Sequence, residues 1–434
     1  MKTLLILIKS SLVTFLVLLF HQSCVVGVVP TQGGLQKKST FRSGLDALLD
    51  NDCMQLRGKR VGLITNQTGV NNEMMQNIDL FIKSENVDLR AIFSPEHGLF
   101  GTVSAGKKII NHKDTLYGVP IFSLYGHTRK PLKDMLKDLD ILVFDIQDIG
   151  IRSYTYISTM GLAMEAALEQ GIEFMVLDRP NPIGLKKIEG NVLETQFSSF
   201  IGMYPIPYVY GLTSGELAMM INGQGWLGKG KCDLTVVEMK NYGRVSTLDE
   251  LGFVWVPTSP HVPSSITPIY MVATGILGEL GIFSIGVGYT TPFMTIAAPW
   301  IDASEMAERM NMLGLKGVMF RPINYKPYYS FHKKHEVGGI QIHIIDQDEI
   351  DLIAIQFYFL QEHNVLYPDK NPFEQGETKH LKMFDKALGT DVIRKNFSKN
   401  FKVSDIQKNL MNGLDDYKNI KYIVKPNILS ITWI

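Results

Sequence analysis

Cysteine is scarce in this sequence, with only three among 434 residues: Cys24, Cys53 and Cys232. The last two lie far apart along the chain, so they define no disulfide framework, and their spacing fits no zinc-binding motif. We therefore expect Cys53 and Cys232 to be buried thiols that pack as small apolar side chains. Neither a disulfide-rich scaffold nor a structural zinc site explains this fold.

An excess of charge of either sign is also missing. The 43 basic and 43 acidic residues give a formal net charge of zero, and the basic residues are scattered along the chain. A nucleic-acid-binding surface needs clustered positive charge, so we expect no nucleic acid partner. The hydrophobic content of 45% is that of an ordinary globular protein, and the length suits about two domains.

No apolar run is long enough to span a bilayer, which takes about 20 residues. The apolar run at residues 12–20 is short and follows two lysines, the pattern of a secretory signal. We expect a signal peptide at residues 1–23 and an exported protein. Cys24 follows a small residue, as at a lipoprotein processing site, although His21 stands where such sites usually have leucine. The mature protein is then either periplasmic or a lipoprotein anchored to the membrane through Cys24.

Nucleotide-binding loops are absent as well. The glycine-rich stretch at residues 275–288 lacks the strand–loop–helix context and the spacing of a dinucleotide site, and residues 66–68 form no phosphate-binding loop. We expect no nicotinamide or ATP site, no other cofactor and no metal.

Short β-branched runs alternate with helical patterns from residue 44 to residue 237. Continuous apolar strands separated by helices indicate a parallel sheet covered on both faces. We predict an α/β fold with a Rossmann-like, doubly wound sheet at residues 40–260. Strands are predicted at residues 60–65, 89–93, 119–123, 139–144 and 173–177, helices at 77–84 and 154–170, and a capping box at Thr213 and Glu216.

The second half of the chain is less regular. Four prolines between residues 257 and 268 indicate a domain boundary. Beyond it we predict a strand at residues 339–345, a helix at residues 350–362 and charged helices near the C-terminus. These elements indicate a smaller α+β domain at residues 261–434.

Polar side chains follow the predicted strands directly, at the edge where open parallel sheets bind ligands. Carboxylates, amides, an arginine and a histidine at one edge suit a polyhydroxylated ligand that bears amide groups. The alternative for Asp145 and Asp178 is that each caps the next helix, and His97 alone is often a structural residue. The full set is Asn66 after the first strand, Glu96 and His97 after the second, Asp145, Gln147, Asp148 and Arg152 after the fourth, and Asp178 and Asn181 after the fifth.

Glu96 is the strongest catalytic candidate in this set. Pro95 restricts the backbone before it and Gly98 frees the backbone after it. Such framing holds a side chain at a defined angle, so we expect function rather than packing to explain Glu96.

Several long segments resemble the signature blocks of the NamZ-type exo-β-N-acetylmuramidases, a family long described only as a domain of unknown function. The resemblance implies an N-terminal Rossmann-like domain, a smaller C-terminal domain and a cleft between them. It also implies release of N-acetylmuramic acid from the non-reducing end of peptidoglycan fragments, with Glu96 as the catalytic glutamate. The blocks are residues 62–69, 93–101, 144–156, 178–184, 210–218 and 338–346, which span nearly the whole chain after the leader.

Glycoside hydrolysis needs a proton donor for the leaving oxygen and commonly a second carboxylate as base or nucleophile. We expect Glu96 to be the acid, and Asp145, Asp148 and Asp178 remain open for the second role. Arg152 is expected to bind the lactyl carboxylate of the substrate. An alternative is a non-catalytic or altered-specificity protein that binds cell-envelope glycans. The other substrate-binding candidates are Asn66, His97, Gln147, Asp148, Tyr154, Asn181 and Glu279.

One segment departs from the family pattern. Where the family usually has a second carboxylate and an arginine after Glu279, this chain has Ile285 and Val287. The loss of two charges from a cleft loop changes the polarity of the substrate site. We therefore expect weaker discrimination between N-acetylmuramic and N-acetylglucosaminic substrates than in relatives with the full pattern.

Overall fold

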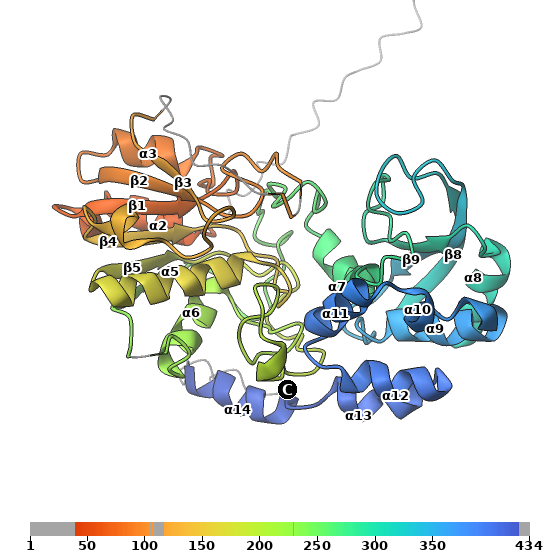
Figure 1. Cartoon of the computed structure of the whole chain (residues 1–434). Helices are drawn as coiled ribbons and strands as arrows, with labels where there is room; N and C mark the ends of the chain where they lie inside the picture. The colour runs from red at the N-terminus through yellow and green to blue at the C-terminus, as the bar shows by residue number, and fades with distance from the viewer. Residues whose placement is uncertain (1–39, 105, 108–116, 229, 425–434) are drawn as a thin grey trace, which may run out of the picture. The chain divides into compact units, whose positions relative to one another are not determined.

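The larger sheet consists of six parallel strands in the order β3-β2-β1-β4-β5-β6. The computed structural model in Figure 1 describes residues 40–104, 106–107, 117–228 and 230–424. The strand order reverses between β1 and β4, which is where sheets of this topology open a crevice at their carboxyl ends. The strands are β1 (Arg60–Thr65), β2 (Asp88–Ser94), β3 (Ile121–Ser123), β4 (Ile141–Asp145), β5 (Glu173–Leu177) and β6 (Leu234–Val237).

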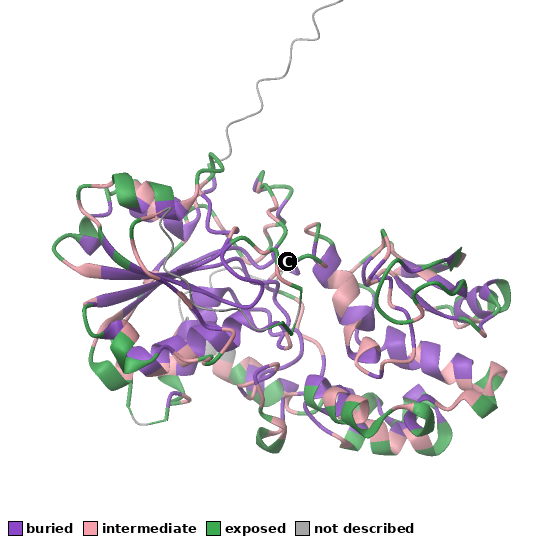
Figure 2. Ribbon diagram, turned by 45° about the horizontal axis from the view of Figure 1, so that its top comes forward, coloured by how far each residue is buried: buried purple, intermediate pink, exposed green. Residues whose placement is uncertain are grey.

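Alternate side chains of the strands pack into two separate hydrophobic clusters, one on each face of the sheet. Val61 and Leu63 of β1 pack with helices α2 and α3. Side chains on the opposite face of the sheet, including Ile64, pack with α5 and α6. Figure 2 shows the strands buried along most of their length. Because helices cover both faces, the predicted doubly wound α/β fold is confirmed. The four helices are α2 (Gly44–Leu49), α3 (Asn77–Lys83), α5 (Tyr156–Gln170) and α6 (Ser214–Gly223).

The predicted strands and helices of this sheet domain all form, with boundaries within two residues of the prediction. Helix α5 ends at Gly171 in the left-handed conformation (φ 67°), and the capping box of Thr213 and Glu216 begins α6. Strand β6 was not predicted. Only the last of its four residues is buried, so the continuous apolar run that identifies the other strands is missing there.

The second sheet is antiparallel, in the order β7-β9-β8. Its helices lie beside it in Figure 1, and the predicted smaller α+β domain is therefore confirmed. The strands are β7 (Thr295–Ala298), β8 (Val318–Tyr325) and β9 (Val337–Ile344), and the longer helices are α7 (Thr267–Gly278), α8 (Ala303–Met312), α9 (Ile355–Leu366), α11 (Thr378–Leu388) and α12 (Val392–Asn400). Shorter helices are α4 (Lys133–Leu136), α10 (Pro372–Gln375) and α13 (Gln407–Leu410).

The last described helix, α14 (Leu414–Val424), returns to the sheet domain and packs against α6 (Figure 1). The Tyr417 hydroxyl donates a hydrogen bond to the backbone carbonyl of Tyr210 at 2.7 Å. The last described helix of the chain thus packs against the first domain. From Phe41 onward the described residues belong to one compact body.

Cys53 and Cys232 are buried free thiols, as predicted. Burial raises the pKa of Cys232 to about 12. The predicted signal peptide and Cys24 lie outside the described residues. Within the part of the chain that the structure describes, no helix combines the length and apolar character needed to cross a bilayer.

Candidate active site

A cavity of about 410 Å³ lies at the carboxyl end of the parallel sheet. Its walls come from the loop after β2, the segment that leads into α5, the segment before α7, helix α7 with the loop that follows it, and one residue of α11. Ile201, Ser330 and Phe331 complete the lining. Both domains therefore contribute to it, as the family resemblance implied.

Glu96 is buried at the wall of this cavity, with 6% of its surface exposed. Its Oε1 accepts a hydrogen bond from the Gly106 amide (2.9 Å), and its Oε2 accepts one from the Thr155 hydroxyl (2.8 Å). Because a hydroxyl can accept as well as donate, Thr155 can serve either protonation state of the carboxyl. The side chain thus keeps one orientation while a proton moves on or off it.

A tight turn presents the Glu96 side chain. The Gly98 amide donates to the Pro95 carbonyl at 3.1 Å, and both His97 (φ 72°) and Gly98 (φ 79°) adopt the left-handed conformation. Such a conformation costs a residue with a side chain about 1–2 kcal/mol, so its presence at His97 marks a constrained turn. The restrictive proline and permissive glycine of the prediction both serve this turn.

Three histidines also line the cavity: His97, His261 and His380. Nδ1 of His97 donates to the Val103 carbonyl (2.7 Å), which leaves its Nε2 for other partners. Nδ1 of His380 donates to the backbone carbonyl of Glu279 (3.0 Å). Burial lowers the pKa of His261, and the nearby His97 lowers it further, so His261 is neutral over most of the physiological range.

Glu279 supplies the second carboxyl group of the cavity. It follows directly after α7, and among the described lining residues only Glu96 and Glu279 carry carboxyl groups. Burial raises the pKa of Glu279, and His380 opposes this shift in part. The resemblance had indicated Glu279 only as a binding residue, and its presence in the same cavity as Glu96 suits it for the second catalytic role.

The three aspartates predicted for that role lie outside the lining of this cavity: Asp145, Asp148 and Asp178. Asp145 is fully buried, and its Oδ1 accepts a hydrogen bond from Nε of Arg179 at 2.6 Å. Its Oδ2 accepts from the Asn77 amide at 2.8 Å. Both oxygens are therefore engaged: Oδ1 is in a buried ion pair that joins the ends of β4 and β5, and Oδ2 is in the hydrogen bond with Asn77.

Asp178 and Asp148 hold neighbouring loops together. Asp178 accepts hydrogen bonds from the Thr213 hydroxyl and the Gly215 amide, each at 2.8 Å, so the alternative of helix capping holds for it, at the start of α6. Burial raises the pKa of Asp178 to about 7. Asp148 accepts from the Tyr210 hydroxyl, and burial raises its pKa to about 6. These shifts come from burial within the fold and not from the cavity.

The three amide side chains of the prediction also stabilise the loops at the strand ends. They bond backbone groups or neighbouring side chains, and none of them lines the cavity. The structure thus places them in the framework around the site. Asn66 accepts from the Thr68 amide (2.9 Å), Gln147 donates to the Pro180 carbonyl (2.7 Å), and Asn181 donates to the Leu212 carbonyl (2.9 Å).

Arg152, predicted to bind the substrate carboxylate, is fully buried and bonded to backbone carbonyls instead. Two of the carbonyls are the last of helix α11, a position where a cation is stabilised by the helix dipole. Gly389 lies against the guanidinium, and a Cβ there would come within 2.7 Å of Nη2. The four acceptors are Asn191 (2.8 Å), Ile206 (2.7 Å), Ala387 (3.1 Å) and Leu388 (2.8 Å). Arg152 therefore joins the two domains. Both of its Nη atoms donate to backbone carbonyls and not toward the cavity.

Tyr154, Ile285 and Val287 all line the cavity. The Tyr154 hydroxyl donates to Oγ1 of Thr258 at 2.8 Å. Ile285 and Val287 give the loop after α7 an apolar surface at the positions where the family usually has charges. The altered loop therefore faces the site, and the expected loss of sugar discrimination stays a prediction.

Sequence reasoning missed Thr155, His261 and His380 as residues of the site. Thr155 follows the predicted Arg152–Tyr154 segment, and His261 lies in the proline-rich segment that was interpreted only as a boundary. His380 stands in a charged helix whose pattern gives no sign of a site. Only the fold brings α11 to this cavity.

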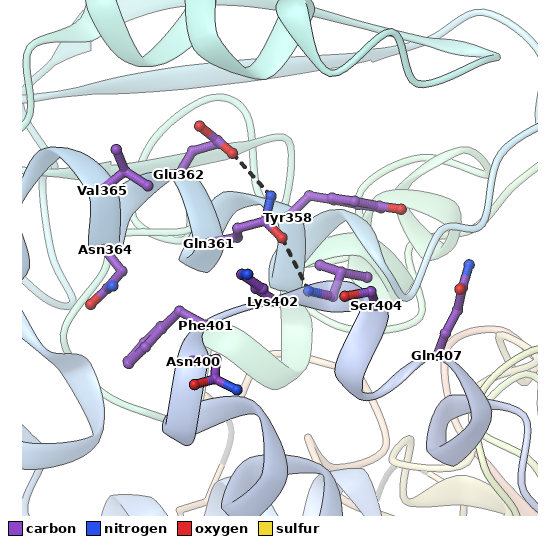
Figure 3. A pocket seen from close by; sticks show the side chains of 11 residues that line it. Tyr358, Gln361, Glu362, Asn364, Val365, Asn400, Phe401, Lys402, Ser404 and Gln407 are labelled. Atoms are coloured by element: carbon purple, nitrogen blue, oxygen red, sulfur yellow. Dashed lines mark hydrogen bonds between the residues drawn. The ribbon is translucent and has the colours of Figure 1, made fainter.

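A second cavity, of about 460 Å³, lies between α9 and the segment that joins α12 to α13 (Figure 3). Its one carboxylate, Glu362, is paired with Arg309 at 2.6 Å and accepts from the Gln361 amide at 3.0 Å. The side-chain carbonyl oxygen of Gln361 accepts from the Val403 backbone amide. This cavity has one carboxylate, which is held in an ion pair, and so lacks the two carboxyl groups of the first cavity. In the described ranges, no cluster of three or more metal-ligating side chains was found.

The chain is also similar to known proteins. Models of exo-β-N-acetylmuramidase NamZ match the chain twice, the N-terminal model at residues 61–266 and the C-terminal model at residues 269–423. The peptidoglycan β-N-acetylmuramidase NamZ of Bacillus subtilis (strain 168) is 40% identical over 390 residues, which cover 89% of this chain and 92% of that protein.

Two crystal structures of DUF1343 family proteins from Bacteroides fragilis NCTC 9343 are also similar. One is 46% identical with a TM-score of 0.85, covering 88% of this chain and 98% of that one. The other is 27% identical with a TM-score of 0.69, covering 89% and 98%. The two-domain fold, the site at the sheet's carboxyl end and matches along most of the chain lead to one assignment: this protein belongs to the NamZ family of exo-β-N-acetylmuramidases.

Proposed function

We propose that this protein is an exo-acting glycoside hydrolase that releases N-acetylmuramic acid from the non-reducing end of peptidoglycan fragments. The observation that carries the proposal is the presence of two carboxyl groups, Glu96 and Glu279, in one cavity of about 410 Å³. Hydrolysis of a glycosidic bond uses such a pair. The cavity is within the size range of small-ligand sites, which suits the end of a glycan chain.

In this mechanism Glu96 is the general acid. Its Oε2 carries the proton and gives it to the glycosidic oxygen as the bond to the anomeric carbon breaks. The ionised Oε2 then accepts a hydrogen bond from the Thr155 hydroxyl. Oε1 stays bonded to the Gly106 amide, which holds the carboxyl in place. Glu279 then serves as the second carboxylate, which either attacks the anomeric carbon or removes a proton from the attacking water.

The proposal is tested with the disaccharide N-acetylmuramyl-β-1,4-N-acetylglucosamine and with longer fragments that end in the same sugar. We expect stepwise release of free N-acetylmuramic acid from the non-reducing end, detected by mass spectrometry. A glycan-binding protein without catalytic activity would bind these fragments and release no sugar. That outcome would favour the alternative of a binding function.

Replacement of Glu279 by glutamine is expected to lower kcat by about 10²-fold or more, because amide nitrogen and oxygen replace a carboxylate that must accept a proton or attack carbon. The pH–rate profile is the decisive measurement. A base must be ionised, so the wild-type rate should fall as pH drops through the raised pKa of Glu279, and this acidic limb should be lost in the variant. An unchanged acidic limb would show that Glu279 only binds substrate.

We also propose export, on the basis of the two lysines and the apolar run that precede Cys24. The mature protein is expected to lack residues 1–23, and acylation of Cys24 would make it a membrane-anchored lipoprotein. Mass spectrometry of the N-terminal peptide tests both steps. Intact Met1 on cytoplasmic protein would contradict export, whereas a free N-terminus after Cys24 would contradict only the lipid.

A further inference from the structure

We propose that Arg129 binds the lactyl carboxylate that distinguishes N-acetylmuramic acid from N-acetylglucosamine, and so determines substrate choice. This inference rests on the proposed function. It arises because the cavity holds no permanent positive charge: among its described lining residues there is no lysine or arginine. Arg152 is bonded to backbone carbonyls, and Val287 stands where the family usually has an arginine.

Arg129 lies near the catalytic carboxyl, with Tyr125 close to both groups. Burial raises the pKa of the Tyr125 hydroxyl, the charge of Glu96 and a hydrogen bond with it raise this pKa further, and Arg129 lowers it. The Tyr125 hydroxyl is therefore within interaction range of both Glu96 and Arg129. The loop after β3 carries both residues, and β3 pairs with β2, whose end carries Glu96.

Two aromatic rings hold the guanidinium in place. Its Cζ lies 4.2 Å from the ring centroid of Phe200 and 5.6 Å from that of Tyr125, and these two rings pack at 5.9 Å. Ile201, the residue after Phe200, lines the cavity. A guanidinium that lies over an aromatic ring can still use N–H groups in its own plane to bind a carboxylate in a bidentate manner. The stack therefore presents a preorganised anion site beside the cavity.

The neighbouring cation has a different environment. Nζ of Lys130 is paired with Glu165 at 3.0 Å and with Glu169 at 2.7 Å, both on α5. In the described ranges, by contrast, Arg129 has no carboxylate within ion-pair distance. A carboxylate supplied by a substrate at Glu96 would complete this arrangement.

The test measures dissociation constants by NMR titration for N-acetylmuramic acid, its methyl ester and N-acetylglucosamine. A charged hydrogen-bonded pair predicts that Arg129→Gln weakens binding of the free acid by about 10- to 100-fold. Binding of the neutral ester and of N-acetylglucosamine should change less than about threefold, because neither carries the charge that Arg129 recognises. Arg129→Lys should restore part of the affinity, since it keeps the charge without the bidentate geometry.

Two matched variants act as controls. Lys130→Gln removes the adjacent, ion-paired cation and should leave all three constants unchanged. Lys107→Gln removes the cation that follows Gly106, whose amide donates to Glu96, and it is the competing candidate. A selective loss in Lys107→Gln, or an equal loss for all three ligands in Arg129→Gln, would overturn the inference.

The same proteins separate this inference from the proposed function. Rates with 4-nitrophenyl β-N-acetylmuraminide and β-N-acetylglucosaminide are measured alongside the titrations. Selective, Arg129-dependent binding without hydrolysis by the wild type would contradict the hydrolase proposal and support Arg129. Hydrolysis with equal preference in wild type and Arg129→Gln would support the hydrolase and contradict Arg129.

Discussion

Glu96→Gln is expected to lower kcat on the disaccharide by at least about 100-fold while the protein stays folded. General acid catalysis contributes about 10²–10⁴-fold, and glutamine keeps the shape of the side chain but has no proton of suitable acidity to transfer. The amide oxygen can still accept from Gly106, and the amide NH2 can donate to the Thr155 hydroxyl oxygen, so the turn around the side chain should persist. The loss should be smaller with 4-nitrophenyl substrates, because a nitrophenolate leaves without protonation.

Glu362→Gln is the matched control for this result. Glu362 is the carboxylate of the second cavity, paired with Arg309, and its replacement should leave kcat unchanged in the folded protein. Circular dichroism and thermal unfolding check that both variants fold. Near-wild-type turnover of the disaccharide by folded Glu96→Gln would remove Glu96 from the mechanism.

Arg152→Met is expected to lower the free energy of unfolding by about 3–5 kcal/mol. The change removes the donors of four hydrogen bonds, and a buried acceptor left without a partner costs about 1–3 kcal/mol, of which methionine packing and local rearrangement recover part. Two of these acceptors end α11, which carries His380 into the cavity. Activity should therefore fall together with stability, as the contact between the domains loosens.

Urea denaturation measures this loss, with Arg321→Met as the control. Arg321 is exposed on β8 and bonds only the Gln341 side chain among the described contacts, so its replacement should cost less than about 0.5 kcal/mol. A stable Arg152→Met protein with a raised KM for muramic substrates would instead support the original prediction that Arg152 binds the lactyl group.

The periodic features of the sequence determined the fold class. Strand and helix patterns depend on neighbouring residues, so continuous apolar runs predicted β1, β2, β4 and β5 and the doubly wound sheet. Glu96 could be selected for the same reason: its Pro95–Gly98 framing is local, and the turn that results is formed within four residues. The capping box that begins α6 is a further local signal that the structure bears out.

The roles of the remaining polar residues were decided only by tertiary structure. Three other polar residues follow strands just as Glu96 does, yet the fold gives each of them a partner. Asp145 pairs with Arg179, Asp178 bonds the start of α6, and Arg152 bonds the end of α11. Glu279 and His380 come from the second domain, far from Glu96 in sequence, and share its cavity. A buried charge needs a partner, because burying an unpaired charge costs too much free energy. Its partner is the group that the folded chain brings within hydrogen-bonding distance. The local pattern therefore identifies which residues are polar at the sheet edge, and long-range packing decides which of them remain free to meet a substrate.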